Sequence, residues 1–217
     1  MPKIKLVVFD MDGTIIEPRS SWAMIHDYFG TDNSEMLQMY IDHKVSDEEF
    51  VKADIKLWNS KSEVPVNEQY INSILDKAKP RDGARELMAS LHEVSIKTVI
   101  LSGGIQYLAD KWAKEWDMSG AFANELIDDA DGNLTANINA SGHNKGPLIE
   151  KIVKDFGLTN GEVAAVGDTM VDLPMFEIAG LSIAVNTSDE RVISKSKYHL
   201  KEGSMKQLAD VIISWKR

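Results

Sequence analysis

Two aspartates, Asp10 and Asp12, stand one residue apart directly after the short apolar run Lys3–Phe9. A β-branched, apolar run of this kind is typical of a buried parallel strand, which would deliver both carboxylates at its carboxyl end. Carboxylates so close repel each other, and a cation is their natural partner. With a hard cation bound, one carboxylate can attack an electrophile while the other transfers a proton. The alternative interpretation is a strand-to-loop turn with solvated acids.

A second pair of aspartates, Asp168 and Asp172, follows the apolar run Val163–Val166 and Gly167. Residues four apart share one face of a starting helix, so these two acids would lie together. Aspartate is also a common helix N-cap, and this structural explanation stays open for the second pair alone. Two acidic strand ends in one sheet can nevertheless converge on a single cation, and we therefore expect one site built from both pairs.

A third polar strand end combines a hydroxyl with two glycines, in Ser102, Gly103 and Gly104. Backbone N–H groups without side-chain obstruction at a helix start can bind phosphate oxygens. Lys145 begins a later helical stretch and would add a positive charge to such a site. A glycine turn capped by serine and a solvated lysine are the structural alternatives.

The strands and helices that position these groups alternate along the chain. At this spacing the alternation predicts a parallel sheet covered by helices on both faces. In such sheets the ligand lies at the carboxyl ends of the strands, where the polar clusters fall. We expect strands over 3–9, 96–101, 163–166 and 181–185, and helices over 83–92, 105–116, 145–156, 173–179 and 204–215.

The segment from about residue 19 to residue 79 breaks the alternation. It has no strand-like run, and its apolar residues recur at helical spacing, which predicts a four-helix insertion. Pro80 marks the return to the core before the next helix. Beyond the core helices, we expect a hairpin formed by residues 122–127 and 134–138.

The composition of the 217-residue chain excludes several classes of protein. Hydrophobic residues make up 43% and charged residues 27%, as in a folded domain and not in a disordered or fibrous chain. A formal charge of -10 disfavours nucleic acid and anionic membranes as partners. Without cysteine, a metal site has only oxygen or nitrogen ligands, which favours a hard cation. No signal segment or long apolar run is present, so we expect a cytoplasmic protein.

Taken together, the four motifs resemble those of the haloacid dehalogenase superfamily of phosphotransferases. Each motif lies at a strand end or a helix start, as in that family, and the likeness covers nearly the whole chain. Segments around residues 102–104, 121–126 and 179–181 are most similar to the phosphoserine phosphatase branch. The motif residues are Asp10-Met11-Asp12-Gly13-Thr14, Ser102, Lys145, and Gly167-Asp168 with Asp172.

The helical insertion occupies the position of the family's cap. The resemblance therefore implies an α/β fold, with a doubly wound, Rossmann-like parallel sheet as the core and an inserted helical cap domain. We expect the core to comprise residues 1–16 and 80–217 and the cap to comprise residues 17–79. On this scaffold the cap would close over the site and recognise the leaving group.

The resemblance also implies a role for each acid. Asp10 would be the nucleophile that takes the phosphoryl group. Asp12 would be the acid that protonates the leaving oxygen and then the base that activates water. Mg²⁺ would be held by the Asp10 carboxylate, the Asp12 carbonyl and Asp168, with Asp172 close by, directly or through water.

Three further groups, Ser102, the Gly103 N–H and Lys145, would by the same resemblance hold the phosphoryl oxygens. This assignment agrees with the chemistry, because transfer of a phosphoryl group to an anionic carboxylate needs charge neutralisation by a metal and a lysine.

The sequence departs from true phosphoserine phosphatases in ways that concern the substrate. Those enzymes usually have Ser in place of Gly13 and Asn in place of Val171. They also carry a cap arginine that binds the serine carboxylate, whereas no arginine occurs between residues 20 and 79 here. Lys52 and Lys56 occupy about the corresponding stretch, and lysine is a poorer bidentate partner for a carboxylate. We therefore expect phosphoserine to be a mediocre substrate and Lys52 or Lys56 to contribute substrate contacts.

The sequence as a whole predicts a Mg²⁺-dependent phosphatase that hydrolyses a small phosphorylated metabolite through an aspartyl-phosphate. One alternative is a phosphomutase or phosphotransferase on the same scaffold, in which a second hydroxyl takes the phosphoryl group. Another is a receiver-like signalling domain, which also places aspartates, a hydroxyl and a lysine around Mg²⁺. A receiver lacks the second aspartate and the helical insertion, and both features favour the enzyme.

Overall fold

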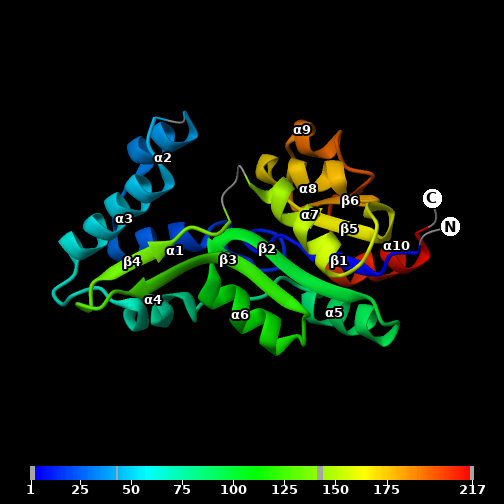
Figure 1. Ribbon diagram of the computed structural model, residues 1–217, viewed down its shortest axis with the longest axis horizontal. Helices are drawn as coiled ribbons and strands as arrows, with labels where there is room; N and C mark the ends of the chain where they lie inside the picture. Colours follow the sequence, from blue (N-terminus) through cyan, green and yellow to red (C-terminus); the bar gives the residue numbers. More distant parts are fainter. Residues whose placement is uncertain (1–2, 43, 141–143, 216–217) are drawn as a thin grey trace.

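A seven-stranded sheet forms the centre of the protein in the computed structural model, which describes residues 3–42, 44–140 and 144–215 (Figure 1). The strand order is β4-β3-β2-β1-β5-β6-β7, and every neighbouring pair is parallel except β3 with β4. The strands are β1 (Leu6–Phe9), β2 (Lys97–Ile105), β3 (Gly120–Asp128), β4 (Leu134–Asn137), β5 (Val163–Gly167), β6 (Leu181–Val185) and β7 (Tyr198–Leu200).

Strand β1 shows why the sheet is buried on both faces. All four of its side chains are buried, and alternate residues point to opposite faces of the sheet. Val7 and Phe9 belong to one apolar cluster, whereas Leu6 and Val8 belong to a second cluster on the other face. A continuous apolar run is therefore what this position requires.

Helices cover both faces of the sheet (Figure 1). Helices α5, α6 and α10 contribute to the apolar cluster that contains Phe9, and α7, α8 and α9 contribute to the other. This doubly wound arrangement confirms the predicted fold class. The helices are α5 (Ala84–Glu93), α6 (Gln106–Glu115), α7 (Lys145–Asp155), α8 (Leu173–Ile178), α9 (Glu190–Ile193) and α10 (Leu208–Ser214), with short 3-10 helices η1 (Asn160–Glu162), η2 (Met170–Asp172) and η3 (Met205–Gln207).

Four helices, here called the cap helices, lie between β1 and α5. Helix α3 begins with a capping box, in which the Ser46 side chain accepts from the Glu49 N–H and the Glu49 carboxylate accepts from the Ser46 N–H. The hairpin of β3 and β4 extends beside these helices and contacts α3 and α4 (Figure 1). The cap helices are α1 (Ser21–Phe29), α2 (Ser34–Ile41), α3 (Asp47–Lys61) and α4 (Glu68–Leu75).

One difference from the predicted elements affects the site. Strand β2 does not end at Leu101 but continues to Ile105, with a shift of its register against β3 between Leu101 and Ile105. A strand edge next to a site often contains such an irregularity, which redirects the backbone. Strand β7 and helix α9 are short and were not predicted.

Within the described residues, no helix is long and apolar enough to cross a membrane.

Candidate active site

The two aspartate pairs meet because their strands are neighbours. Strand β1 pairs in parallel with β5, with Phe9 opposite Val166, so both chains leave the sheet at the same edge. One carboxylate oxygen each from Asp10, Asp168 and Asp172 lies within 4.8 Å of the others, and all three residues are buried. The predicted convergence of two acidic strand ends is therefore present in the structure.

Lys145 lies between two of these acids. It is the first residue of α7 and is only 1% exposed. Its Nζ donates to Asp10 Oδ1 and to Asp172 Oδ1, at 2.7 Å in each case. Burial alone would lower the pKa of the Lys145 ammonium, but the two carboxylates outweigh burial and raise it. The lysine is therefore a fixed positive charge at the sheet edge.

One ammonium does not neutralise the acids around it. Burial raises the pKa of the Asp10 carboxyl to about 8, and repulsion by Asp172 and Asp168 adds to this, although Lys145 opposes it. Burial and the Asp172 charge likewise raise the pKa of Asp168 to about 7, against the hydrogen bond from Thr14. Further positive charge at this point would restore the ionised forms of both acids.

The remaining carboxylate oxygens show where a cation fits. Asp172 has both oxygens engaged, because its Oδ2 accepts from the backbone N–H groups of Asp168 and Thr169, each at 3.0 Å. Asp168 Oδ1 accepts from the Thr14 hydroxyl at 3.0 Å. Among the described residues, nothing donates to Asp10 Oδ2 or Asp168 Oδ2. The free oxygens of these two buried residues suit a hard divalent cation, with Asp172 placed to act through water.

Gly13 brings the loop after β1 against Asp168. A Cβ on Gly13 would lie 2.4 Å from Asp168 Oδ2, and its φ of +71° favours glycine. The Gly13 carbonyl accepts from Asn186 Nδ2 at 2.9 Å and from Arg81 at 3.2 Å, which hold the loop from two other segments. With the loop in this conformation, a serine at position 13 does not fit.

Asp12 is held apart from the other acids by a residue that the sequence analysis missed. Its Oδ2 accepts from the Ser21 N–H at 2.7 Å and from the Ser21 hydroxyl at 2.8 Å, at the start of α1. Its Oδ1 is buried and has no partner among the described residues. Burial raises the pKa of Asp12, even though the bonds from Ser21 oppose this. Nothing in the sequence marked Ser21, which resembles an ordinary residue of a first helical turn.

Ser102 and Gly103 lie in the irregular part of β2. Ser102 is buried, and its Oγ accepts from the Gly104 N–H at 3.1 Å. The Gly103 carbonyl accepts from Trp22 Nε1 at 3.0 Å and from Asn124 Nδ2 at 2.9 Å. These two bonds fix the orientation of the Gly103 peptide, and neither Trp22 nor Asn124 was predicted for the site.

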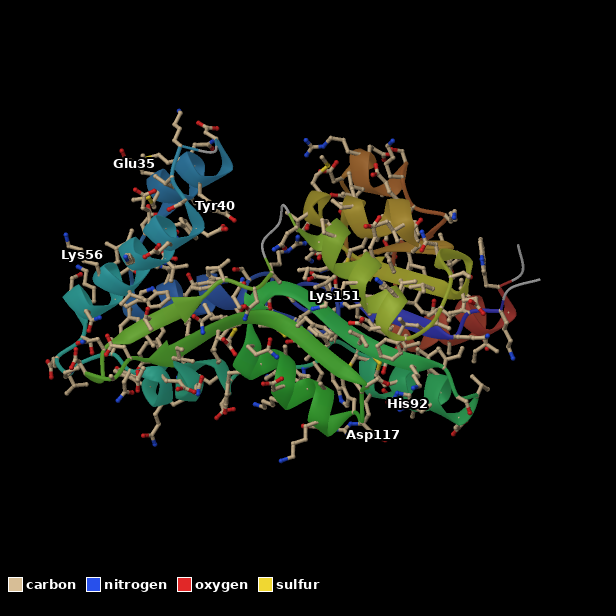
Figure 2. The ribbon with its side chains drawn as sticks, viewed as in Figure 1. Glu35, Tyr40, Lys56, His92, Asp117 and Lys151 are labelled. Carbon is tan, nitrogen blue, oxygen red and sulfur yellow. The ribbon has the colours of Figure 1, made fainter. Side chains whose placement is uncertain are left out.

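The cap lysines lie elsewhere. Lys52 is paired with Glu48 on the exposed side of α3, with 69% of its side chain accessible, and Lys56 points away from the core (Figure 2). Neither lysine lines the cavity beside Lys145, which does not support the expected contact between these lysines and the substrate. They face outward because Val51, Asp54 and Trp58 occupy the inner face of the same helix. His143, a loop residue with no predicted metal role, lies outside the described residues.

Comparisons with known proteins agree with this geometry. A family model described as haloacid dehalogenase-like hydrolase matches residues 4–180. A phosphoserine phosphatase of Archaeoglobus fulgidus is 30% identical over 85% of this chain, which spans only 53% of that protein. One of Methanocaldococcus jannaschii is 27% identical, over 84% of this chain and 85% of its own length.

A solved structure shows the same fold over its whole length. It is described as a phospho-aspartyl intermediate analogue of phosphoserine phosphatase and superposes with a TM-score of 0.78 at 24% identity, covering 97% of this chain and 99% of the other. The predicted resemblance to the phosphoserine phosphatase branch is therefore confirmed. From its motifs, its fold and the family match, this chain belongs to the haloacid dehalogenase-like hydrolases.

Proposed function

We propose that this protein is a Mg²⁺-dependent phosphatase that hydrolyses a small phosphomonoester through an aspartyl-phosphate on Asp10. The observation that carries the proposal is the arrangement of Asp10. One of its oxygens is held by Lys145, which itself lines a cavity, while the other accepts no hydrogen bond from the described residues. A buried, fixed carboxylate next to a compensating charge is suited to nucleophilic attack.

In the first step, one oxygen of the Asp10 carboxylate attacks phosphorus and the bond between phosphorus and the alcohol oxygen breaks. Asp12 gives its proton to that oxygen, for which its raised pKa and its unpartnered Oδ1 are suited. In the second step, Asp12 takes a proton from water, and the water oxygen attacks phosphorus. Phosphate leaves and the Asp10 carboxylate is regenerated.

The phosphoryl oxygens need donors in both steps. We assign this role to Ser102, to the Gly103 N–H and to Lys145. Ser102 and Gly103 lie in the last part of β2, and Lys145 is the first residue of α7. Mg²⁺ would be held by Asp10, Asp168 and the Asp12 carbonyl, with Asp172 through water, and would supply charge neutralisation for the transferring group. Preorganised charges of this kind stabilise a phosphoryl-transfer transition state without moving.

The named relatives support the reaction class. Relatives described as phosphoserine phosphatases match most of this chain, and a substrate-bound phosphoserine phosphatase has the same fold.

Residues 17–79 form the cap domain in this proposal, and residues 1–16 and 80–217 form the core domain. The cytoplasmic location stays a prediction.

The test measures release of inorganic phosphate from a primary alkyl phosphate in the presence of MgCl₂, with water as the sole acceptor. We expect turnover that EDTA abolishes and Mg²⁺ restores, and ¹⁸O from labelled water in the phosphate. Turnover only after a second alcohol is added would indicate a phosphotransferase. Formation of a stable aspartyl-phosphate with no turnover at all would indicate a receiver-like domain.

A further inference from the structure

A cavity of about 590 Å³ lies between the cap helices and the sheet edge. Lys145, Gly103 and Asn124 line its inner end, so the cavity opens directly onto the groups that would hold the phosphoryl oxygens. On the proposed function, the alcohol of the substrate would extend into this space, because Lys145 and Gly103 line it. Pockets of roughly 300–1,000 Å³ enclose drug-sized molecules, which are far larger than the three-carbon alcohol of phosphoserine.

The walls of this cavity are mainly apolar. They come from the cap helices on one side and from the end of the hairpin on the other. On the cap side, the Tyr40 and Phe50 rings stack at 4.8 Å, and Trp22 stacks on the buried Trp58 at 6.2 Å. Both stacks fix an aromatic surface. The apolar and aromatic side chains of the lining are Trp22, Ala23, Leu37, Tyr40, Phe50, Val51, Ile138, Ala140 and Val171.

The charges in the lining are unfavourable for a carboxylate. Among the described lining residues, the acids are Asp27, Asp32 and Asp47, and the only lysine or arginine is Lys145, which already binds two carboxylates. Asp27 and Asp32 are exposed at the mouth of the cavity, and Asp47 accepts from the Tyr40 hydroxyl. From the described lining residues, a carboxylate on the substrate would therefore meet three acids and no lysine or arginine other than Lys145.

His26, which also lines the cavity, already has protein partners at both ring nitrogens. Its Nδ1 lies 2.7 Å from the Thr31 hydroxyl oxygen and 3.3 Å from Trp58 Nε1. Its Nε2 lies 3.2 Å from the buried carboxylate of Asp54. The imidazole is therefore directed at these protein groups and not at a substrate carboxylate. The nearest lysines of α3 face outward, as described above.

From this cavity we propose that the substrate is a phosphomonoester of a bulky, apolar alcohol without a carboxylate. This inference rests on the proposed phosphatase function and adds to it the chemical class of the leaving group. The apolar walls would bind the alcohol by burying its surface, and the three aspartates would select against anionic alcohols. The aspartates at the mouth, being solvated, bind a cationic alcohol only weakly.

The test compares four primary alkyl phosphates that share a three-carbon chain and differ in the groups on it: propyl, 3-phenylpropyl and 3-aminopropyl phosphate, and O-phosphoserine. We expect kcat/KM for 3-phenylpropyl phosphate to exceed that for propyl phosphate by about tenfold or more, the lower range for one added apolar group in a fitting pocket. Phosphoserine should be the poorest of the four.

Cap variants test where the selectivity arises. Phe50→Ala should lower the ratio of phenylpropyl to propyl kcat/KM by about fivefold or more, because it removes one wall of the cavity. Leu37→Ser should lower it too, and Leu37 is 42% exposed, so this variant does not depend on repacking a core. Lys52→Ala, on the outer face of α3, should leave the ratio unchanged.

The outcomes separate the two proposals. Preference for phosphoserine or 3-aminopropyl phosphate, or a ratio that neither cap variant alters, would overturn the apolar assignment while leaving a working phosphatase. No phosphate release from any of the four esters under Mg²⁺ would overturn the proposed function itself.

Discussion

The acidic site at the carboxyl ends of the strands, here called the sheet edge, and the cavity beside the cap helices, here called the cap cavity, are built in different ways. At the sheet edge, Asp10, Lys145 and Asp172 are joined by 2.7 Å bonds between buried groups from three separate segments. In the cap cavity, the walls are mostly apolar side chains, and the acids at its mouth are exposed. Buried charges that are joined by hydrogen bonds tolerate few substitutions, whereas apolar walls tolerate substitutions of similar volume. On the functions proposed above, the first region does the chemistry and the second selects the substrate.

Asp10→Asn should have the largest effect on the chemistry at the sheet edge. The amide is nearly isosteric but is no nucleophile, so we expect kcat to fall by about 10²-fold or more for every ester, whatever its alcohol. Circular dichroism should show an unchanged fold. As the matched control in the cap cavity, Asp27→Asn should leave kcat for propyl phosphate within about threefold, the scale of an exposed charge. A variant at Asp10 that kept a tenth of the activity would rule out this residue as the nucleophile.

Lys145→Ala should have the next largest effect. Loss of the ammonium leaves Asp10 and Asp172 facing each other, and breaking a buried pair in this way typically costs about 3–5 kcal/mol of stability. We expect kcat to fall by about 10- to 100-fold at a temperature where the variant is folded, as judged by thermal denaturation. The control is Lys201→Ala, since Lys201 is an exposed lysine that directly follows β7. Equal behaviour of the two variants would return Lys145 to a merely structural role.

Gly13→Ala tests the close approach of the loop to Asp168. Gly132, in the hairpin turn, has a similar φ of +80° but nothing within 4 Å of an added Cβ. Both substitutions share a left-handed backbone cost of about 1 kcal/mol, so their difference isolates the clash with Asp168. We expect kcat to fall about tenfold or more for Gly13→Ala and to stay near wild type for Gly132→Ala. A loss of thermal stability without loss of kcat would show that the loop can move without affecting the site.

Glu162→Gln should have the smallest effect, since Glu162 belongs to neither region. Hydrogen bonds from Lys5 and Thr159 lower the pKa of Glu162 to about 2. A lowered pKa in the folded state stabilises the protein above the ordinary pKa of 4.5, and this contribution is lost as the pH falls toward 2. The Tm difference between wild type and variant should therefore be small at pH 6 and vanish near pH 2, with kcat unchanged. A difference that grew in acid would contradict the assignment.

The sequence by itself determined the sheet and the chemical content of its edge. The strands at 6–9 and 163–166 are apolar throughout because strands buried on both faces must be, and the acids follow where the strands end. Parallel strands place those ends on one edge, so the proximity of Asp10 and Asp168 was predictable from the sequence. These are local patterns joined by a general rule of topology.

Only the tertiary structure decided which side chains contact each other across the cap. Ser21 reaches Asp12, and Trp22 reaches Gly103, because of how α1 sits on β2. Lys52 was predicted at the substrate but faces outward, since the rotation of α3 about its axis is set by packing of Val51 and Trp58. Helical periodicity shows that a helix has an apolar face, but not which neighbour that face meets or what space remains between them. The cavity arises from that packing, and so does the choice of substrate that we propose for it.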